Sequence, residues 1–201
     1  FYLTVGGIRP DNPAYNHSGS GGGFRLDAAG TVDTAAANAI GIIGQTIGGG
    51  GGIVNLTVAS VENEGDEIVI RLGGNQLNTG GEFGHAGAPP PESGLAASTL
   101  TSEGNVTTQG VLSHGIVAQA IGGGGGVSNV VFGTDLQLTD KGTSIILGSG
   151  TGGAGGNGSD LVVNAMGVST SGAGAIGIVA QSIGGGGGLT GIANGVSLLG
   201  Q

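Results

Sequence analysis

The sequence predicts an all-β fold, a right-handed parallel β-solenoid (β-helix) with glycine-rich corners and loop excursions. The main observation is a short apolar pattern followed by five consecutive glycines, which occurs three times and aligns without a gap. The glycine runs begin at Gly48, Gly122 and Gly184 and end at Gly52, Gly126 and Gly188. Glycine accounts for 51 of the 201 residues but lacks the three-residue period of collagen. A constant core with loops of variable length between the copies is typical of a repeat array.

Each copy of the apolar pattern is predicted to be a buried strand. The copies occupy Ala39–Ile47, Ser113–Ile121 and Ala175–Ile183. They contain β-branched residues with small residues between them, which fits a pleated strand better than a helix. The glycines on both sides also oppose a helix. One aligned column holds only Gly44, Ala118 and Ala180, which indicates a tightly packed neighbour on that side.

The alignment extends upstream through a short turn to a Val-x-Thr strand, and this gives three repeat cores in a single array over residues 1–201. The cores are residues 24–52, 95–126 and 161–188. Further strands are expected at Phe1–Val5, Ile53–Val61, Ile68–Leu72, Val127–Leu138 and Thr143–Leu147. The first, third and fifth of these resemble one another. Loop excursions rich in glycine or proline are expected at Ile8–Gly23, Gly73–Gly94 and Gly148–Gly158.

The spacing of the copies suggests how many coils each repeat forms. Gly122 follows Gly48 by 74 positions, and Gly184 follows Gly122 by 62. Three coils of about 20 residues would fill such a unit and advance the axis by roughly 14 Å. The pentaglycines are then corners where backbones pass too closely for a Cβ atom or where φ is positive. A flexible linker and an extended polyglycine strand are the alternatives.

A glutamine column follows the same repeat. Gln45, Gln119 and Gln181 are equivalent and precede the three glycine runs. Stacked-amide ladders are one use of such a column. With three coils in each unit, however, these glutamines would lie too far apart to touch, so we expect buried structural glutamines bonded to backbone or to other side chains. The last residues begin a further segment, and we interpret the chain as a fragment of a longer polypeptide.

Charge and composition exclude several classes of protein. The net charge is −9, with 4 basic and 13 acidic residues. A nucleic-acid partner needs clustered Lys and Arg, which are missing. No basic patch suits anionic lipid, and no apolar run reaches the 18 or so residues of a membrane span, so we expect no membrane insertion of this segment. Without cysteine there is no disulfide framework and no thiolate metal site.

The repeat phrase resembles a known family. Ser113–Gly126 reads Ser-His-Gly-Ile-Val-Ala-Gln-Ala-Ile and then five glycines, and Gly177–Gly188 repeats this phrase. It resembles the repeats of large glycine-rich autotransporter passenger proteins of Gram-negative bacteria, and the resemblance covers most of residues 24–190. It implies secretion through a C-terminal outer-membrane barrel, a β-helical stalk at the cell surface, and a role in adhesion, aggregation or biofilm.

Candidate metal sites are weak, and we predict no cofactor. Gly155–Val163 fits the calcium nonapeptide once, with Asp160 as the ligand, but shared sites need consecutive nonapeptides and no adjacent copy is present. A solvated turn is therefore preferred to calcium at Asp160. The acidic run Glu62, Glu64, Asp66 and Glu67 likewise suits a soluble turn better than a hard-cation site.

No catalytic residue is predicted either. His114 stands where the other copies have Ile40 and Ile176, which indicates a packed or edge histidine rather than a catalytic base. His17 and His85 lie in different loops without metal-ligand spacing. The glycine runs lack the Lys-Ser/Thr of a phosphate loop.

Three function hypotheses remain. The first is a non-enzymatic extracellular structural or adhesive protein, a stalk or filament segment that associates with itself head to tail or laterally and has cell-surface or matrix glycans as further partners. The second is a carbohydrate-binding or carbohydrate-cleaving β-helix, which would need paired carboxylates and stacking aromatics. The third is a flat ice- or mineral-binding surface, but no regular Thr-x-Thr array supports it. We prefer the first.

Overall fold

The computed structural model describes residues 2–5, 20–49, 51–58, 68–72, 97–133, 143–147 and 156–196, and this part of the chain is all-β. The strands pair in parallel into four sheets within the described residues. In chain order they are β1 (Tyr2–Val5), β2 (Arg25–Ala28), β3 (Val32–Thr34), β4 (Ile42–Ile47), β5 (Gly51–Val58), β6 (Ile68–Leu72), β7 (Ser98–Thr108), β8 (Ile116–Ile121), β9 (Gly125–Gly133), β10 (Thr143–Leu147), β11 (Leu161–Thr170), β12 (Ile178–Ile183) and β13 (Gly187–Val196).

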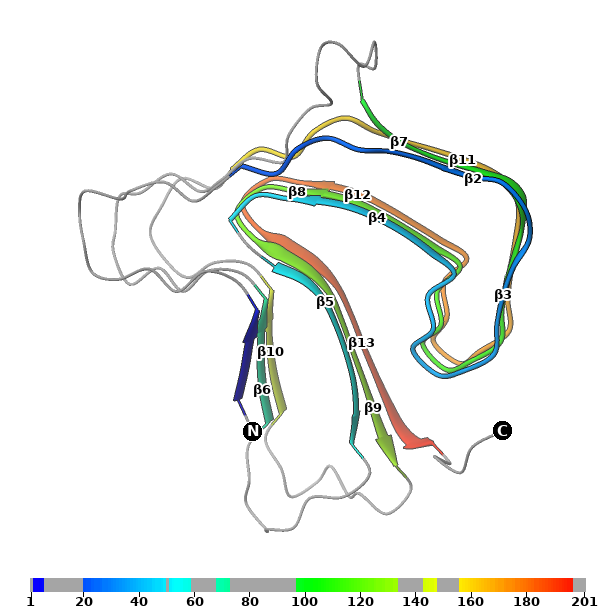
Figure 1. Cartoon of the computed structure of the whole chain (residues 1–201). Helices are drawn as coiled ribbons and strands as arrows, with labels where there is room; N and C mark the ends of the chain where they lie inside the picture. Colours follow the sequence, from blue (N-terminus) through cyan, green and yellow to red (C-terminus); the bar gives the residue numbers. More distant parts are fainter. Residues whose placement is uncertain are drawn as a thin grey trace, which may run out of the picture.

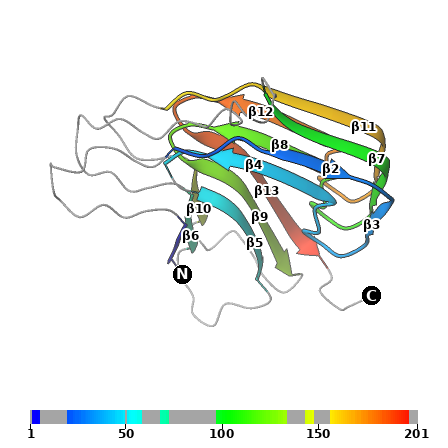
Figure 2. The same ribbon diagram turned by 45° about the horizontal axis from the view of Figure 1, so that its top comes forward.

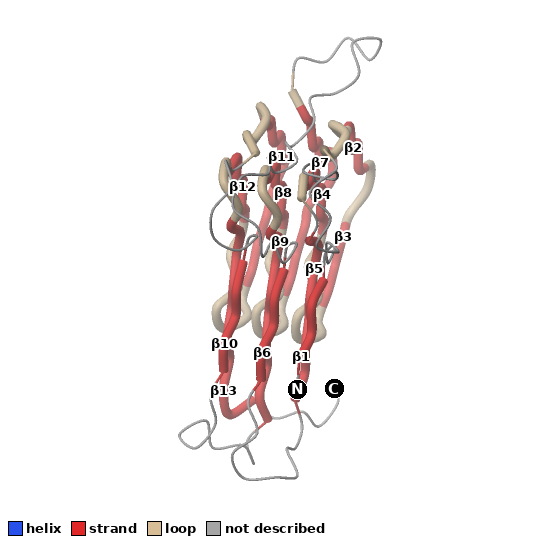
Figure 3. The backbone as a smooth tube through the Cα atoms, turned by 90° about the vertical axis from the view of Figure 1, so that its left-hand side faces the viewer, coloured by secondary structure: helices blue, strands red, loops and turns tan. Residues whose placement is uncertain are grey.

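The strands are arranged as three stacked layers. Layer 1 comprises β1 to β5, layer 2 comprises β6 to β9, and layer 3 comprises β10 to β13, and every layer contributes to each of the four sheets. The first sheet has the order β1-β6-β10, and the second has β2 and β3 beside β7 and then β11. The third sheet is β4-β8-β12 and the fourth is β5-β9-β13. Viewed along the stack, the three layers nearly superimpose, and from the side they form three parallel columns (Figures 1 and 3).

The pairing register shows that each repeat forms one layer. Ile42 pairs with Ile116, and Ile116 with Ile178, which are the positions that the sequence alignment equates. Expecting three coils in each repeat was therefore wrong. The error arose from assuming coils of about 20 residues, whereas the chain passes through all four sheets before it returns to the same position. Each repeat thus advances the stack by about 4.8 Å, one strand spacing, and not by about 14 Å.

The path of a layer doubles back on itself, so that sheets pack face to face (Figures 1 and 2). One apolar cluster lies between the second and third sheets and includes Leu100, Val106 and Ile116. A second cluster lies between the third and fourth sheets and includes Val117 and Val127. Because neighbouring residues of a strand point to opposite faces, Ile116 and Val117 supply the third sheet with an apolar side chain on each face.

The predicted strands are present where the structure describes them, but the apolar strands are shorter than predicted: β4, β8 and β12 begin at Ile42, Ile116 and Ile178, because the three residues before each belong to the preceding turn. The three similar segments at the start of each layer pair as β1, β6 and β10 in the aligned register, for example Leu3 with Ile70 and Ile70 with Ile145. The loop excursions predicted at Ile8–Gly23, Gly73–Gly94 and Gly148–Gly158 fall mostly outside the described residues, as do Glu62, Glu64, Asp66, Glu67, His17 and His85.

Differences in repeat length are concentrated in one connection. From Val32 to Ile42, from Val106 to Ile116 and from Val168 to Ile178, the chain takes the same ten positions to pass from the second sheet to the third. By contrast, the passage from the first sheet to the second has a different length in each layer. Between equivalent residues it takes 22 positions in layer 1 (Leu3 to Arg25), 29 in layer 2 (Ile70 to Thr99) and 17 in layer 3 (Ile145 to Val162). Only the passage from first to second sheet varies widely.

Candidate functional site

The glutamine column forms a continuous amide ladder through the stack. Gln45 Nε2 donates to Gln119 Oε1 at 2.6 Å, and Gln119 Nε2 donates to Gln181 Oε1 at 2.6 Å. Gln119 is completely buried and also donates to the Gly126 carbonyl at 3.4 Å. The expectation that these glutamines lie too far apart to touch was therefore wrong, because each repeat is one layer. The ladder is directional, because in both bonds the amide nitrogen of the earlier layer donates to the amide oxygen of the layer that follows in sequence.

The pentaglycines form the bend between the third and fourth sheets. Gly124 N donates to Gly48 O at 2.6 Å, so the bend itself is bonded between layers. A Cβ added to Gly49 would lie 3.0 Å from the carbonyl carbon of Gly123, and one on Gly125 would overlap the carbonyl oxygen of Gly187. Gly123, Gly125 and Gly126 also have positive φ of 83°, 140° and 137°. Both reasons anticipated for a corner, close backbone approach and positive φ, are present.

The first and last glycines of each run lie at opposite ends of this bend. Gly48, Gly122 and Gly184 open the bend, directly after strands β4, β8 and β12. Gly52, Gly126 and Gly188 are the second residues of β5, β9 and β13. A Cβ on Gly126 would overlap the carbonyl oxygen of Gly52, and one on Gly188 that of Gly126. These last glycines therefore face the preceding layer, whereas Gly49 and Gly125 face the following one.

A threonine column, whose role was not recognised from the sequence, fixes the turn between the second and third sheets. Thr34 Oγ1 donates to the Ala39 carbonyl at 2.9 Å, and Thr108 Oγ1 makes the equivalent bond to the Ser113 carbonyl. The Ser113 hydroxyl donates in turn to Ala36 O of layer 1 at 2.7 Å. The repeated Val-x-Thr was the available signal, because a threonine that recurs just before a turn suits a hydroxyl-to-backbone bond.

The same turn has a left-handed residue in every layer. Asn38, Leu112 and Gly174 are aligned and have φ of 61°, 54° and 69°. Asparagine and glycine accept this conformation readily, whereas leucine rarely adopts it. The Leu112 side chain is buried, and a Cβ on Gly174 would lie 2.7 Å from its Cδ2 atom. The glycine in layer 3 therefore leaves room for the leucine below it.

His114 is a packed residue, as its position among isoleucines indicated. Its side chain is 1% exposed, and its Nδ1 accepts a hydrogen bond of 3.1 Å from the Ile176 backbone N–H of layer 3. Burial lowers the pKa of His114, and a polar contact with the Asn129 side chain opposes this shift less strongly. The neutral ring therefore serves as an acceptor between layers 2 and 3.

Asp160 is exposed, and its backbone carbonyl accepts a hydrogen bond of 2.9 Å from Ser98 N. Within the described ranges, no three His, Cys, Asp or Glu side chains gather as a metal site would require. Nor does that part of the chain contain a helix of the length and apolar character needed to cross a lipid bilayer.

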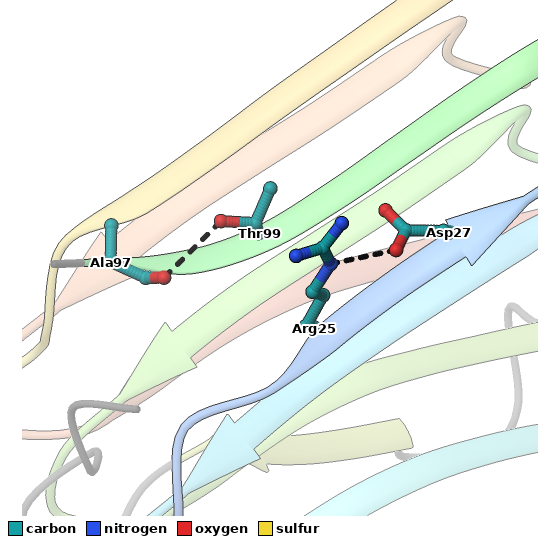
Figure 4. A network of polar contacts seen from close by, with 4 residues as sticks. All are labelled: Arg25, Asp27, Ala97 and Thr99. Atoms are coloured by element: carbon teal, nitrogen blue, oxygen red, sulfur yellow. Dashed lines mark hydrogen bonds and ion pairs between the residues drawn. The ribbon is translucent and has the colours of Figure 1, made fainter. Parts of the chain in front are cut away.

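The two ends of the stack differ in charge. Residues 161–196, which include β11, β12 and β13, contain no Asp, Glu, Lys, Arg or His, and β10 has none either. Among the described strands of layer 1, charged residues lie only in the second sheet: Asp33 is on β3, and Arg25 Nε donates to Asp27 Oδ2 on β2 at 2.7 Å (Figure 4). These two side chains are 60% and 46% exposed, so the ion pair contributes little stability.

Layer 3 also exposes apolar side chains. Six of the seven large hydrophobic side chains found exposed in the described residues belong to it: Ile146, Val162, Met166, Ile176, Ile178 and Ile192. These side chains are exposed because layer 3 is the end of the stack, not because its residues differ in kind from those of layer 2. Ile116 of layer 2 is fully buried, whereas its equivalent Ile178 is 46% exposed because no further layer covers it.

Comparisons with protein-family models, with curated proteins and with solved structures find no match to this chain. The likeness to autotransporter passengers therefore depends on the repeat phrase alone.

Proposed function

We propose that the chain is a segment of a right-handed parallel β-solenoid from an autotransporter-like surface protein. In this proposal it has no enzymatic activity and acts outside the cell as a stalk or filament segment in attachment, aggregation or a biofilm matrix. Its partners are other copies of itself and glycans of the cell surface or matrix. The proposal needs no metal or other cofactor.

The observation that carries the proposal is the direct stacking of whole repeats. Equivalent residues 74 and 62 positions apart share amide and backbone hydrogen bonds along one axis. A stack of this kind can be lengthened by adding repeats, because each new layer meets only its neighbour. The third and fourth sheets carry no charged residue in any strand, so like charges do not accumulate in these two sheets as layers are added.

Immunogold electron microscopy of intact cells tests this proposal. Antibodies are raised against the 201-residue chain and applied to cells that produce the parent protein and to a strain from which its gene is deleted. We expect label on surface stalks or fibres of the producing cells, and weaker cell aggregation in the deletion strain. Label confined to the cell interior would rule the proposal out.

A second assay addresses the carbohydrate alternative. The purified chain is incubated with surface and matrix polysaccharides, and the release of reducing ends is measured. No release above the buffer control is the expected result. Sustained release would favour the carbohydrate-cleaving β-helix over a stalk.

A further inference from the structure

We infer that the layer-3 end of this chain binds the layer-1 end of a second copy, head to tail and in the register of the internal layers. The inference rests on the proposed filament role and deepens it, since it states which faces meet and which residues pair. Ile178 would stack on Ile42 of the next copy, and Gln181 on Gln45, because these residues already share columns within the chain.

The first argument is steric and concerns Gly177. Within the chain, a Cβ on Gly41 would lie 2.6 Å from Gly115 O, and one on Gly115 would lie 2.5 Å from Gly177 O, so both positions exclude a side chain. A Cβ on Gly177 would meet only Val168 Cγ1 at 3.9 Å, which is an ordinary contact, and its φ is not positive. Nothing in a single copy requires glycine there. A further layer stacked in register would require it.

The second argument is the direction of the amide ladder. In both bonds the nitrogen of the earlier layer donates to the oxygen of the next, so the Gln45 oxygen is left at the layer-1 end. Gln181 Nε2 donates to Gly188 O of its own layer at 3.5 Å, as Gln119 Nε2 does to Gly126 O, and its second N–H is left for a following layer. A donor therefore meets an acceptor when the two different ends join. Two layer-3 ends would instead bring two donors together. The ladder thus favours a heterologous contact, which leads to open filaments rather than closed dimers.

The third argument is the lack of edge protection. Soluble proteins usually blunt sheet edges with charged residues or proline. The strands of layer 3 have neither, and they expose Ile178 and Ile192, while Ile176 is exposed in the turn before β12. The facing third and fourth sheets of layer 1, strands β4 and β5, are likewise uncharged. In these two sheets a second copy therefore covers the end without burying a charge, and it continues an interface that the chain already makes twice.

Disulfide cross-linking tests the polarity and the register. The chain has no cysteine, and Asp27 and Asn164 are exposed residues in one column, both aligned with Thr101. Stacked in register they come within the Cα separation that a disulfide accepts. Asp27→Cys and Asn164→Cys chains are mixed and oxidised, and we expect a mixed dimer as the main cross-linked product. Asn164→Cys homodimers as the main product, or no cross-link, would overturn the inference.

Matched glycine variants test the steric argument. We expect Gly177→Ala to keep the circular dichroism and unfolding midpoint of the wild type but to remain monomeric in sedimentation velocity at concentrations where the wild type forms filaments. Gly115→Ala, the same change in layer 2, should unfold the chain. Glu103→Gln, at an exposed side chain of layer 2, should leave assembly unchanged. A filament-forming Gly177→Ala chain would contradict the inference.

A charged variant gives an independent readout. Ile192→Lys places a charge on the exposed layer-3 edge, and we expect at least a tenfold rise in the concentration needed for assembly, with an unchanged fold.

Electron microscopy of wild-type filaments should show an axial repeat of about 14 Å, three strand spacings, for each subunit. A monomeric wild-type chain would reject the contact between copies and would favour a further layer of the same polypeptide as the occupant of this end.

The outcomes separate this inference from the proposed function. A monomeric chain whose antibody labels surface stalks rejects only the contact between copies. A specific mixed cross-link together with an intracellular label rejects only the extracellular role.

Discussion

Gly44 is the smallest member of its column because a ring occupies the space where its side chain would lie. A Cβ on Gly44 would be 2.6 Å from Phe24 Cε2 and 2.8 Å from Phe24 Cζ. The equivalent residues in layers 2 and 3 are Ala118 and Ala180, and the residues that align with Phe24 in those layers, Ser98 and Leu161, have no aromatic ring. This departure of the first repeat, glycine in place of alanine, is therefore paired with a large residue nearby.

This pairing predicts a non-additive effect on stability. Gly44→Ala should lower the free energy of unfolding by about 1–3 kcal/mol, since it overpacks the contact with Phe24. Phe24→Leu combined with Gly44→Ala should be more stable than Gly44→Ala alone. Urea denaturation followed by circular dichroism gives the free energies of unfolding of the wild type, both single variants and the double variant. If the two changes simply add, Phe24 is not the obstacle.

His114 makes stability depend on pH. Its folded-state pKa lies below the unfolded value of 6.5, so the unfolded chain binds the proton first as the pH falls. The stabilisation by the neutral ring is fully present above pH 6.5. It decreases by about 1.4 kcal/mol per unit as the pH falls below 6.5, until the folded-state pKa is reached.

The chain itself supplies the control for this pH dependence. Isoleucine occupies the equivalent position in layers 1 and 3, so His114→Ile should keep the packing while it removes the titrating group. Unfolding free energies of both proteins are measured between pH 5 and 8. We expect their difference to change only below about pH 6.5, and parallel profiles would exclude the role of His114.

At the scale of a strand, the amide ladder joins β4, β8 and β12 through side chains as well as through backbone. Gln119→Leu would leave the Gln45 nitrogen and the Gln181 oxygen without their partner, and should cost about 2 kcal/mol of stability. Replacing Gln45, Gln119 and Gln181 together by leucine removes donors and acceptors alike. That triple variant should be more stable than Gln119→Leu, because loss of both partners costs less than an unsatisfied buried group.

Chemical denaturation of the single and triple variants checks this order. Gln45→Leu is the matched comparison, since Gln45 lies in an end layer and is only partly buried. Its cost should fall below that of Gln119→Leu. A triple variant less stable than Gln119→Leu would show that the ladder contributes net stability as a unit.

Strand positions could be predicted from the sequence because each strand is marked by local pattern. The β-branched and small residues around Gln119 and the five glycines after Ile121 are enough to place β8 and the bend that follows it. The number of coils in each repeat could not be predicted from local sequence pattern. It depends on whether Gln45 and Gln119 meet, and a spacing of 74 residues fits one long layer as well as three short coils. The threonine bond and the left-handed Leu112 likewise depend on partners that only the fold brings near.

At the scale of the whole molecule, only layer 2 is covered on both sides. Strands β8 and β9 are buried along their whole length, whereas their equivalents β4, β5, β12 and β13 are partly exposed. Amide hydrogen exchange of dilute single copies should therefore be at least about tenfold slower in β8 and β9 than at aligned positions of layers 1 and 3. Equal protection in all layers would mean that the stack opens only as one unit.

The connection between the first and second sheets gives the stack one side that can change independently of the rest. It holds twelve residues fewer in layer 3 than in layer 2, and yet the aligned strands on both sides keep their register. Insertions and deletions at this point need no compensating change in the core. Each layer has one such connection, and the connections of neighbouring layers start from strands that are about 4.8 Å apart. Mutations confined to this connection can therefore introduce several closely spaced binding sites. The avidity of such sites together exceeds the affinity of any one of them.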